Sequence, residues 1–313
     1  MTTFHPDLQG VARFLPRISV GPRLAGLVNA LTGLRGVPKI PVVDGVAIED
    51  LTVPGPQGAP PLRVRLYRPK QAAGPVPGVL WIHGGGFVIG FPEQDERSSI
   101  ALVHRLGIAV AAVQYRLAPA NPFPAPLEDC YAALKWLHLE AKALGVLPTR
   151  LAIAGASAGG GLAAGLALLA HDRAEVPLVF QALIYPMLDD ATVTRADLDT
   201  ADLRMWTEHS NRFGWSAYLG KAPGSADVSP YAAPARRKDL TRLPPAWIGV
   251  GTFDLFHDED LAYARRLRDA GVPCELLAIP GAYHGFDVIQ PRTGIVHQFR
   301  ASWAEALRVA LFA

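Results

Sequence analysis

The chain has 313 residues, of which 50% are hydrophobic and 19% are charged, so it can bury a large core and is not a disordered chain. Its formal net charge is only +2, which excludes the basic field of a nucleic-acid-binding protein and favours small-molecule partners. The longest stretch without a strongly polar residue, 158–170, is too short to span a bilayer, and the first residues lack a secretory signal pattern. We therefore expect a cytoplasmic protein without stable membrane insertion.

The first 45 residues mix apolar residues with arginines and are repeatedly broken by proline, which predicts short helices and loops outside the core. From Leu62, alternation of apolar and polar residues predicts a strand with one face in water. Continuous apolar runs then predict strands buried on both faces of a parallel sheet. These runs are 78–82, 108–114, 151–154, 178–184, 246–251 and 274–279.

Helical patterns separate the strands, at 129–144, 158–171, 260–270 and 295–311, and Asp129 is a plausible N-cap of the first. This alternation predicts an α/β fold whose mostly parallel sheet is covered by helices on both faces. Residues 188–235 interrupt the alternation with helical patches and no buried strand, which is typical of an inserted lid. Cys130 and Cys274 are expected to be free, buried thiols, and neither has metal-ligand spacing, so we expect no metal site.

Ser157 lies in the pattern Gly-x-Ser-x-Gly between a predicted strand and a helix of small residues. This context favours a nucleophile elbow, in which a sharp turn exposes the hydroxyl at a helix N-terminus. The alternative is that the glycines only permit close packing of helix and sheet, while Ser157 is an ordinary N-cap.

The run His-Gly-Gly-Gly at 83–86 follows another predicted strand. Glycines can turn their N–H groups toward the oxygen of a tetrahedral intermediate, so Gly85 and Gly86 are candidate oxyanion donors, with Ala158 as the third. His83 is expected to order this loop rather than to act as a base. A phosphate-binding loop is the competing interpretation, but no Lys-Ser/Thr follows the glycines.

A serine nucleophile needs a base, and the base needs an orienting carboxylate. Asp254 ends one apolar run, and His284 lies in a loop after the next. Asp258 fits better as a helix cap, His257 lies too close to Asp254 in the chain, and His297 belongs to the last helix. The order Ser157, Asp254, His284 is the one expected of an α/β hydrolase.

These segments, together with Tyr-Arg-Leu-Ala-Pro at 115–119 and His-Gly-Phe at 284–286, resemble the hormone-sensitive-lipase-like carboxylesterases. The resemblance implies the α/β-hydrolase fold, Ser157 as nucleophile, His284 as base and acid, Asp254 as orienting carboxylate, and no cofactor. It also implies a cap made of residues 1–45 and 188–235, around a catalytic core made of 46–187 and 236–313. Dimerisation through an edge strand occurs in the family, so a homodimer is possible.

The sequence departs from the usual family pattern at Ala156 and Ala120, where Asp and Glu are common, and at Ala233, where Ser is common. None of these changes removes a catalytic group. The sequence therefore predicts a serine esterase for short- to medium-chain carboxylic esters. An amidase or arylacetamide deacetylase would use the same triad, and a non-catalytic receptor is disfavoured because His284 is present.

Substrate choice is expected to lie in the cap, where aromatic and apolar residues could form a pocket or simply hold the cap to the core. The candidates for substrate binding are Phe14, Trp206 and Trp215, with Phe4, Leu203 and Phe213 nearby in the same segments.

Overall fold

The computed structural model describes residues 3–17 and 19–313, and it is built around one eight-stranded sheet in the order β1-β2-β4-β3-β5-β6-β7-β8. The strands are β1 (Val46–Val53), β2 (Leu62–Pro69), β3 (Val76–Ile82), β4 (Ala109–Gln114), β5 (Val146–Ala156), β6 (Phe180–Ile184), β7 (Ala246–Phe253) and β8 (Cys274–Tyr283). β2 pairs antiparallel with β1 and β4, and the other pairs are parallel. The mostly parallel sheet predicted from the sequence is therefore confirmed.

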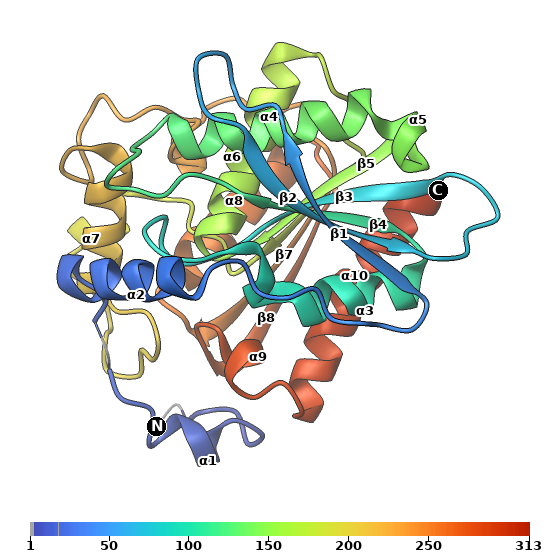
Figure 1. The fold of residues 1–313 in the computed structure, drawn as a ribbon. Helices are drawn as coiled ribbons and strands as arrows, with labels where there is room; N and C mark the ends of the chain where they lie inside the picture. The colour runs from blue at the N-terminus through green and yellow to red at the C-terminus, as the bar shows by residue number, and fades with distance from the viewer. Residues whose placement is uncertain (1–2, 18) are drawn as a thin grey trace.

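Helices cover both faces of the sheet, with α4, α6 and α8 on one side and α3 and α10 on the other (Figure 1). The α-helices are α1 (Gln9–Ala12), α2 (Pro22–Arg35), α3 (Glu96–Leu106), α4 (Ala125–Leu139), α5 (Ala141–Leu144), α6 (Ala158–Arg173), α7 (Glu208–Leu219), α8 (His257–Asp269), α9 (Phe286–Ile289) and α10 (Gly294–Phe312). Three short 3₁₀ helices are η1 (Pro92–Asp95), η2 (Thr192–Thr194) and η3 (Pro234–Arg236). Among the described residues, no helix is both long and apolar enough to cross a membrane.

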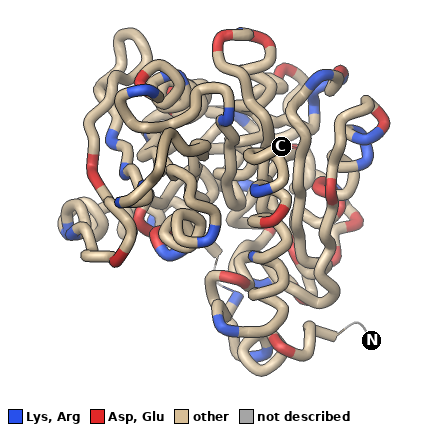
Figure 2. The backbone as a smooth tube through the Cα atoms, turned by 90° about the vertical axis from the view of Figure 1, so that its right-hand side faces the viewer, with Lys and Arg blue, Asp and Glu red and all other residues tan. Residues whose placement is uncertain are grey.

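The prediction that the strand from Leu62 has one face in water is wrong. Arg65 of β2 is fully buried because its guanidinium donates hydrogen bonds to Asp50 of β1 and to Glu96 at the start of α3. The edge strand β1, which supplies Asp50, has no counterpart among the predicted elements, because its sequence is buried only at its two ends. Acidic and basic residues are interspersed along the backbone, with neither sign confined to one part of it (Figure 2).

Two expected helix caps are also wrong. α4 begins at Ala125, so Asp129 lies inside the helix, where it is fully buried and its carboxylate accepts hydrogen bonds from Arg116 at 2.7 and 2.8 Å. Asp258 lies in the first turn of α8, not at its N-cap, and pairs with Arg195. Both carboxylates bind arginine instead of capping a helix. Cys130 is buried as expected, whereas Cys274 is only partly buried, and both thiols are free.

The N-terminal segment and residues 188–235 lie side by side, with α2 next to α7 (Figure 1). The backbone N–H of Val20 donates to the hydroxyl of Ser210 at 2.8 Å, and the hydroxyls of Ser19 and Thr207 lie 3.0 Å apart. Earlier in the chain, the N–H of His5 donates to the carbonyl of Gly281 at 3.0 Å. The N-terminal segment therefore bridges residues 188–235 and the end of β8, just before His284.

Candidate active site

Ser157 occupies a sharp turn between β5 and α6, with φ +57° and ψ −123°. This positive φ is unusual for a residue with a side chain, and it is held by backbone hydrogen bonds from Ser157 to Ile184 and from Met187 to Ser157. A Cβ at Gly159 would lie 2.1 Å from the carbonyl oxygen of Ile82, so only glycine permits this approach of α6 to β3. The Ser157 side chain makes no helix-capping hydrogen bond, which removes the support for a simple N-cap.

The hydroxyl of Ser157 faces a histidine and a carboxylate in line. Oγ of Ser157 lies 3.0 Å from Nε2 of His284, and Nδ1 of His284 lies 2.7 Å from Oδ2 of Asp254. The other carboxylate oxygen of Asp254 accepts the N–H of Phe256 at 3.0 Å, which fixes the carboxylate plane. All three residues are buried, with exposed fractions of 5–8%. This is the geometry in which a carboxylate orients an imidazole that activates a hydroxyl.

Aromatic rings enclose the imidazole of His284. The rings of Tyr185 and Phe256 meet it edge to face, with centroid distances of 4.8 and 5.2 Å. Tyr185 is itself anchored, because its hydroxyl donates to Asp287 at 2.7 Å, and burial raises the pKa of this phenol well above its ordinary value. The two other histidines considered from the sequence lie elsewhere: His257 pairs with Asp258, and His297 is exposed on α10.

The glycine run after β3 lies directly beside Ser157. A Cβ at Gly84 would be 3.3 Å from Cβ of Ser157, and a Cβ at Gly85, where φ is +118°, would be 2.0 Å from the carbonyl oxygen of Ile89. A side chain at Gly84 would therefore crowd the turn at Ser157, and a side chain at Gly85 would clash with the backbone of Ile89. The structure thus brings the loop containing Gly85 and Gly86 (the glycine loop) together with Ser157. Ala158 follows the serine as the first residue of α6.

His83 lies beneath this loop rather than facing the hydroxyl of Ser157. Its Nδ1 is 2.8 Å from the carbonyl of Gly84, and its ring stacks on Tyr115 at a centroid distance of 4.2 Å. Burial lowers the pKa of His83 to about 4, so the ring is neutral near pH 7. The hydroxyl of Tyr115 donates to the backbone carbonyl of His83 at 2.8 Å. These contacts support a loop-ordering role.

Of the three residues expected to bind substrate, only Trp206 reaches the triad. Its ring touches Gly86, since a Cβ there would lie 2.1 Å from Cη2, and its centroid is 6.4 Å from that of His284. Trp215 is fully buried, and its ring packs against Phe87. Phe14 is 86% exposed, so the expectation that it forms a pocket wall is wrong in this structure. The short loop after α1 leaves its ring in solvent.

Two residues that the sequence reasoning missed connect the insertion to the site. Gly214 of α7 packs on the glycine loop, because a Cβ there would lie 2.8 Å from the carbonyl oxygen of Gly86. Glu259 of α8 accepts the N–H groups of Leu188 and Asp189, at 2.7 and 3.1 Å, where the insertion begins. A glycine within a helical pattern is a signal of close packing that could have identified Gly214, whereas Glu259 has no local signal of this kind.

A nucleophile elbow after β5, a carboxylate after β7 and a histidine after β8 define the α/β-hydrolase class. Residues 79–288 match a family described as alpha/beta hydrolase fold. The chain belongs to this family, in its branch of hormone-sensitive-lipase-like carboxylic ester hydrolases.

Individual relatives agree with this assignment. The chain is 36% identical to the esterase LipI of Mycobacterium tuberculosis over 264 residues, which are 81% of this chain and 79% of the relative. It is 37% identical to an ethyl acetate hydrolase of Pseudomonas putida, over 72% of this chain and 71% of that protein. Among solved structures, a bacterial heroin esterase superposes with a TM-score of 0.89 at 39% identity, over 99% and 98% of the two chains.

Proposed function

We propose that this protein is a serine carboxylesterase that hydrolyses short- to medium-chain esters through an acyl-enzyme. The observation that carries the proposal is the line of hydrogen bonds from Ser157 through His284 to Asp254, with distances of 3.0 and 2.7 Å. The names of the relatives support the same reaction class, since one is an esterase and another an ethyl acetate hydrolase.

In the first half of the reaction, Oγ of Ser157 attacks the ester carbonyl while Nε2 of His284 accepts its proton. Asp254 stabilises the imidazolium through Nδ1. The N–H groups of Gly85, Gly86 and Ala158 bind the oxyanion, and removing one such donor typically costs about 10²–10³ in turnover. His284 then protonates the departing alcohol. In the second half, His284 activates water, which hydrolyses the acyl-enzyme and restores Ser157.

The acyl group meets a wall supplied by the insertion. Trp206 covers Gly86, and its indole N–H donates to Asn211 at 3.2 Å, which holds the ring in place. A rigid aromatic wall this close to the glycine loop favours short acyl chains. In this proposal, residues 1–45 and 188–235 together form the cap over the catalytic core. An amidase would use the same triad, and no contact in the site favours it over an esterase.

The test is hydrolysis of p-nitrophenyl esters from acetate to palmitate by the wild type and by Ser157→Ala. We expect activity to be highest on short chains and to fall by about 10⁴-fold in the variant. Ser99→Ala is a matched control, because Ser99 is fully buried and its hydroxyl has no hydrogen-bond partner in the described part of the chain. Ester hydrolysis that persists in Ser157→Ala, or turnover of p-nitroanilides in preference to esters, would overturn the proposal.

A further inference from the structure

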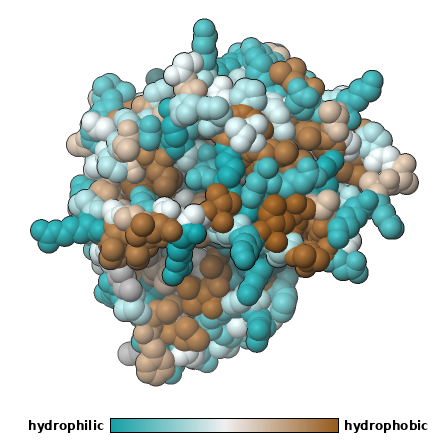
Figure 3. All heavy atoms as spheres, viewed as in Figure 1, coloured by the Kyte–Doolittle hydropathy of each residue, from teal (hydrophilic) through white to brown (hydrophobic). Residues whose placement is uncertain are grey.

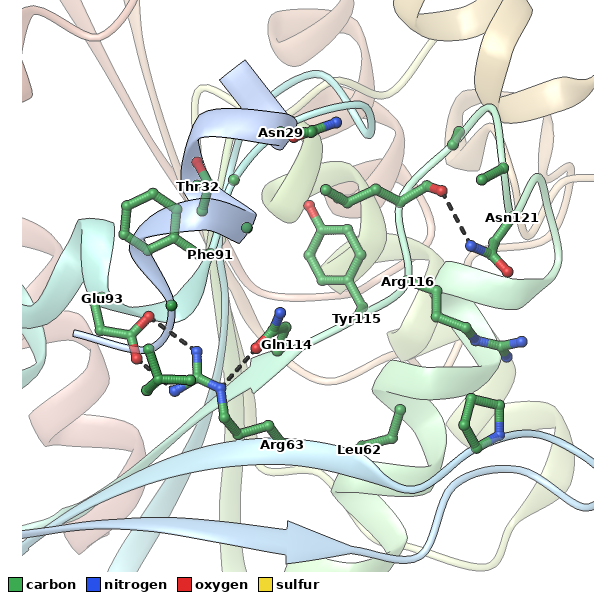
Figure 4. Close-up of a pocket in the computed structure, with 18 of the residues that line it drawn as sticks. Asn29, Thr32, Leu62, Arg63, Phe91, Glu93, Gln114, Tyr115, Arg116 and Asn121 are labelled. Atoms are coloured by element: carbon green, nitrogen blue, oxygen red, sulfur yellow. Dashed lines mark hydrogen bonds and ion pairs between the residues drawn. The ribbon is translucent and has the colours of Figure 1, made fainter. Parts of the chain in front are cut away.

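A cavity of about 850 Å³ lies under α2, at the start of β2 and the end of β4 (Figure 4). Its volume falls in the range of about 300–1,000 Å³ that is typical of small-molecule sites. The described residues that line it include none of the triad and none of the three proposed oxyanion donors. The cavity is therefore separate from the site at Ser157.

Three residues that line this cavity donate hydrogen bonds to backbone carbonyls of the glycine loop and its flanks. The hydroxyl of Tyr115 donates to the carbonyl of His83 at 2.8 Å, and the N–H of Ala118 donates to the carbonyl of Phe87 at 3.0 Å. From α2, the amide of Asn29 donates to the carbonyl of Val88 at 2.8 Å. Residues before and after Gly85 and Gly86 are thus hydrogen-bonded to residues that line the cavity. A molecule bound here would touch the groups that position the loop.

The roof of the cavity is a thinly packed helix. Ala25 is the only residue of α2 that is buried, and Leu27, Leu31 and Leu34 are 57%, 49% and 83% exposed, so apolar atoms lie on the surface at the place of α2 (Figure 3). Gly33 faces the cavity, and a Cβ built on it meets no other atom within 4 Å. The space under α2 is therefore open to a side chain or a ligand.

The charged side chains that line the cavity form ion pairs, with one exception among the described residues. Arg63 pairs with Glu93 and also bonds Gln114, a group that lies on one side of the cavity in Figure 4. Arg116, on the other side, pairs with Asp129. Arg35 ends α2 and makes no hydrogen bond or ion pair with any described residue.

The rest of the wall is largely apolar and includes Leu62, Phe91 and Leu117. A free guanidinium beside an apolar wall matches a carboxylate attached to an apolar tail, because the head group gains a charge-assisted hydrogen bond while the tail leaves water. We propose that this cavity is an accessory binding site for a carboxylate with a medium-length alkyl tail, and that its occupant acts on the glycine loop through Tyr115, Ala118 and Asn29.

Calorimetric titration with decanoate tests the site without requiring turnover, so the result does not depend on the proposed esterase reaction. Gly33→Trp should fill the cavity and weaken binding by about tenfold or more. Gly26→Trp is the matched control, since Gly26 is also in α2, also has no atom within 4 Å of a built Cβ, and does not line the cavity. We expect this control to bind decanoate as the wild type does.

Arg35→Gln tests the head group on an exposed residue whose replacement does not disturb the fold. We expect about tenfold weaker binding of decanoate and unchanged binding of 1-decanol. No heat of decanoate binding in the wild type, or equal affinities of Gly33→Trp and Gly26→Trp, would overturn the assignment of the site.

Coupling to the glycine loop is tested by steady-state hydrolysis of p-nitrophenyl acetate with and without decanoate. Decanoate should change kcat in the wild type and in Gly26→Trp but not in Gly33→Trp. Purely competitive inhibition that is equal in all three proteins would mean that decanoate binds only at the triad, and would contradict the accessory site.

Discussion

The wall that Trp206 forms against Gly86 gives a quantitative prediction for acyl-chain preference. Trp206 is 5% exposed; its ring touches Gly86, and the centroid of the ring lies 6.4 Å from that of His284. In the proposed reaction, Trp206→Ala would replace an indole by open space at the point where the acyl chain leaves the carbonyl. Longer chains should then bury methylene groups that the wild type leaves in water or excludes.

The size of the change follows from the burial of each added methylene. About 0.8 kcal/mol per buried CH₂ corresponds to about fourfold in kcat/KM. The two methylenes that separate hexanoate from butyrate should therefore shift the hexanoate-to-butyrate ratio by about 15-fold in Trp206→Ala. The variant should also lose about 3–5 kcal/mol of unfolding free energy, because a large buried ring is removed.

Trp215→Ala is the control for this measurement. Trp215 is buried like Trp206, but its ring packs on Phe87 and Tyr218. We expect a similar loss of stability and an unchanged hexanoate-to-butyrate ratio in p-nitrophenyl ester assays. If the ratio in Trp206→Ala stays within about twofold of the wild type, some other group limits the acyl chain and the reasoning is wrong.

Three further predictions concern carboxylates. Burial raises the pKa of Asp95 from 3.8 to about 6, so the stability that this group contributes is complete below about pH 3.8 and is lost as pH rises through about 6. Asp95→Asn should be about 3 kcal/mol more stable than wild type in urea unfolding at pH 8 and equal to it below pH 4, and a constant difference would contradict this. Glu259→Ala should lower the unfolding free energy by about 3 kcal/mol, because two backbone N–H groups lose their acceptor. Glu259→Gln should lower the unfolding free energy by less, and equal losses in the two variants would show that the hydrogen bonds are not the cause. Ala156→Asp should alter the pH profile of ester hydrolysis or the unfolding temperature, because it adds a carboxylate next to Ser157, and two unchanged profiles would refute the expectation.

The sheet and the candidate triad could be predicted because their signals are local. β5 and β7 each contain a continuous apolar run, and the side chain follows at the end of the strand, as Ser157 follows β5 and Asp254 follows β7. The prediction that 274–279 is buried on both faces is wrong, because β8 is an edge strand and most of these residues are partly or fully exposed. Parallel strands bring those ends to one edge of the sheet, so order along the chain was enough to predict that Ser157, Asp254 and His284 lie together. In the structure, Ser157 lies 3.0 Å from His284, and His284 lies 2.7 Å from Asp254.

Features that depend on distant partners could not be predicted in this way. Arg65 looks like a solvent-facing residue of an alternating strand until Asp50 and Glu96 are placed around it. Asp129 has the sequence context of a helix cap, but its arginine partner, thirteen positions earlier, draws it into the core. In both cases an ion pair with good geometry makes burial of a charge possible, and no periodicity in the sequence records it.

The end of β8, just before His284, shows how the N-terminal segment and the candidate site depend on each other. In the sequence, Pro280 and Gly281 indicate only a turn after a strand. In the structure, Gly281 has φ +68°, and a Cβ on it would lie 2.4 Å from the backbone nitrogen of His5. The N–H of His5 donates to Gly281, and the N–H of Gly281 donates to the hydroxyl of Thr252 on β7. Glycine is needed here because the N-terminal segment packs directly on the backbone of β8. The end of β8, from which His284 follows, is therefore held between β7 and the N-terminal segment, so this segment supports the geometry of the candidate triad as well as contributing to the proposed cap.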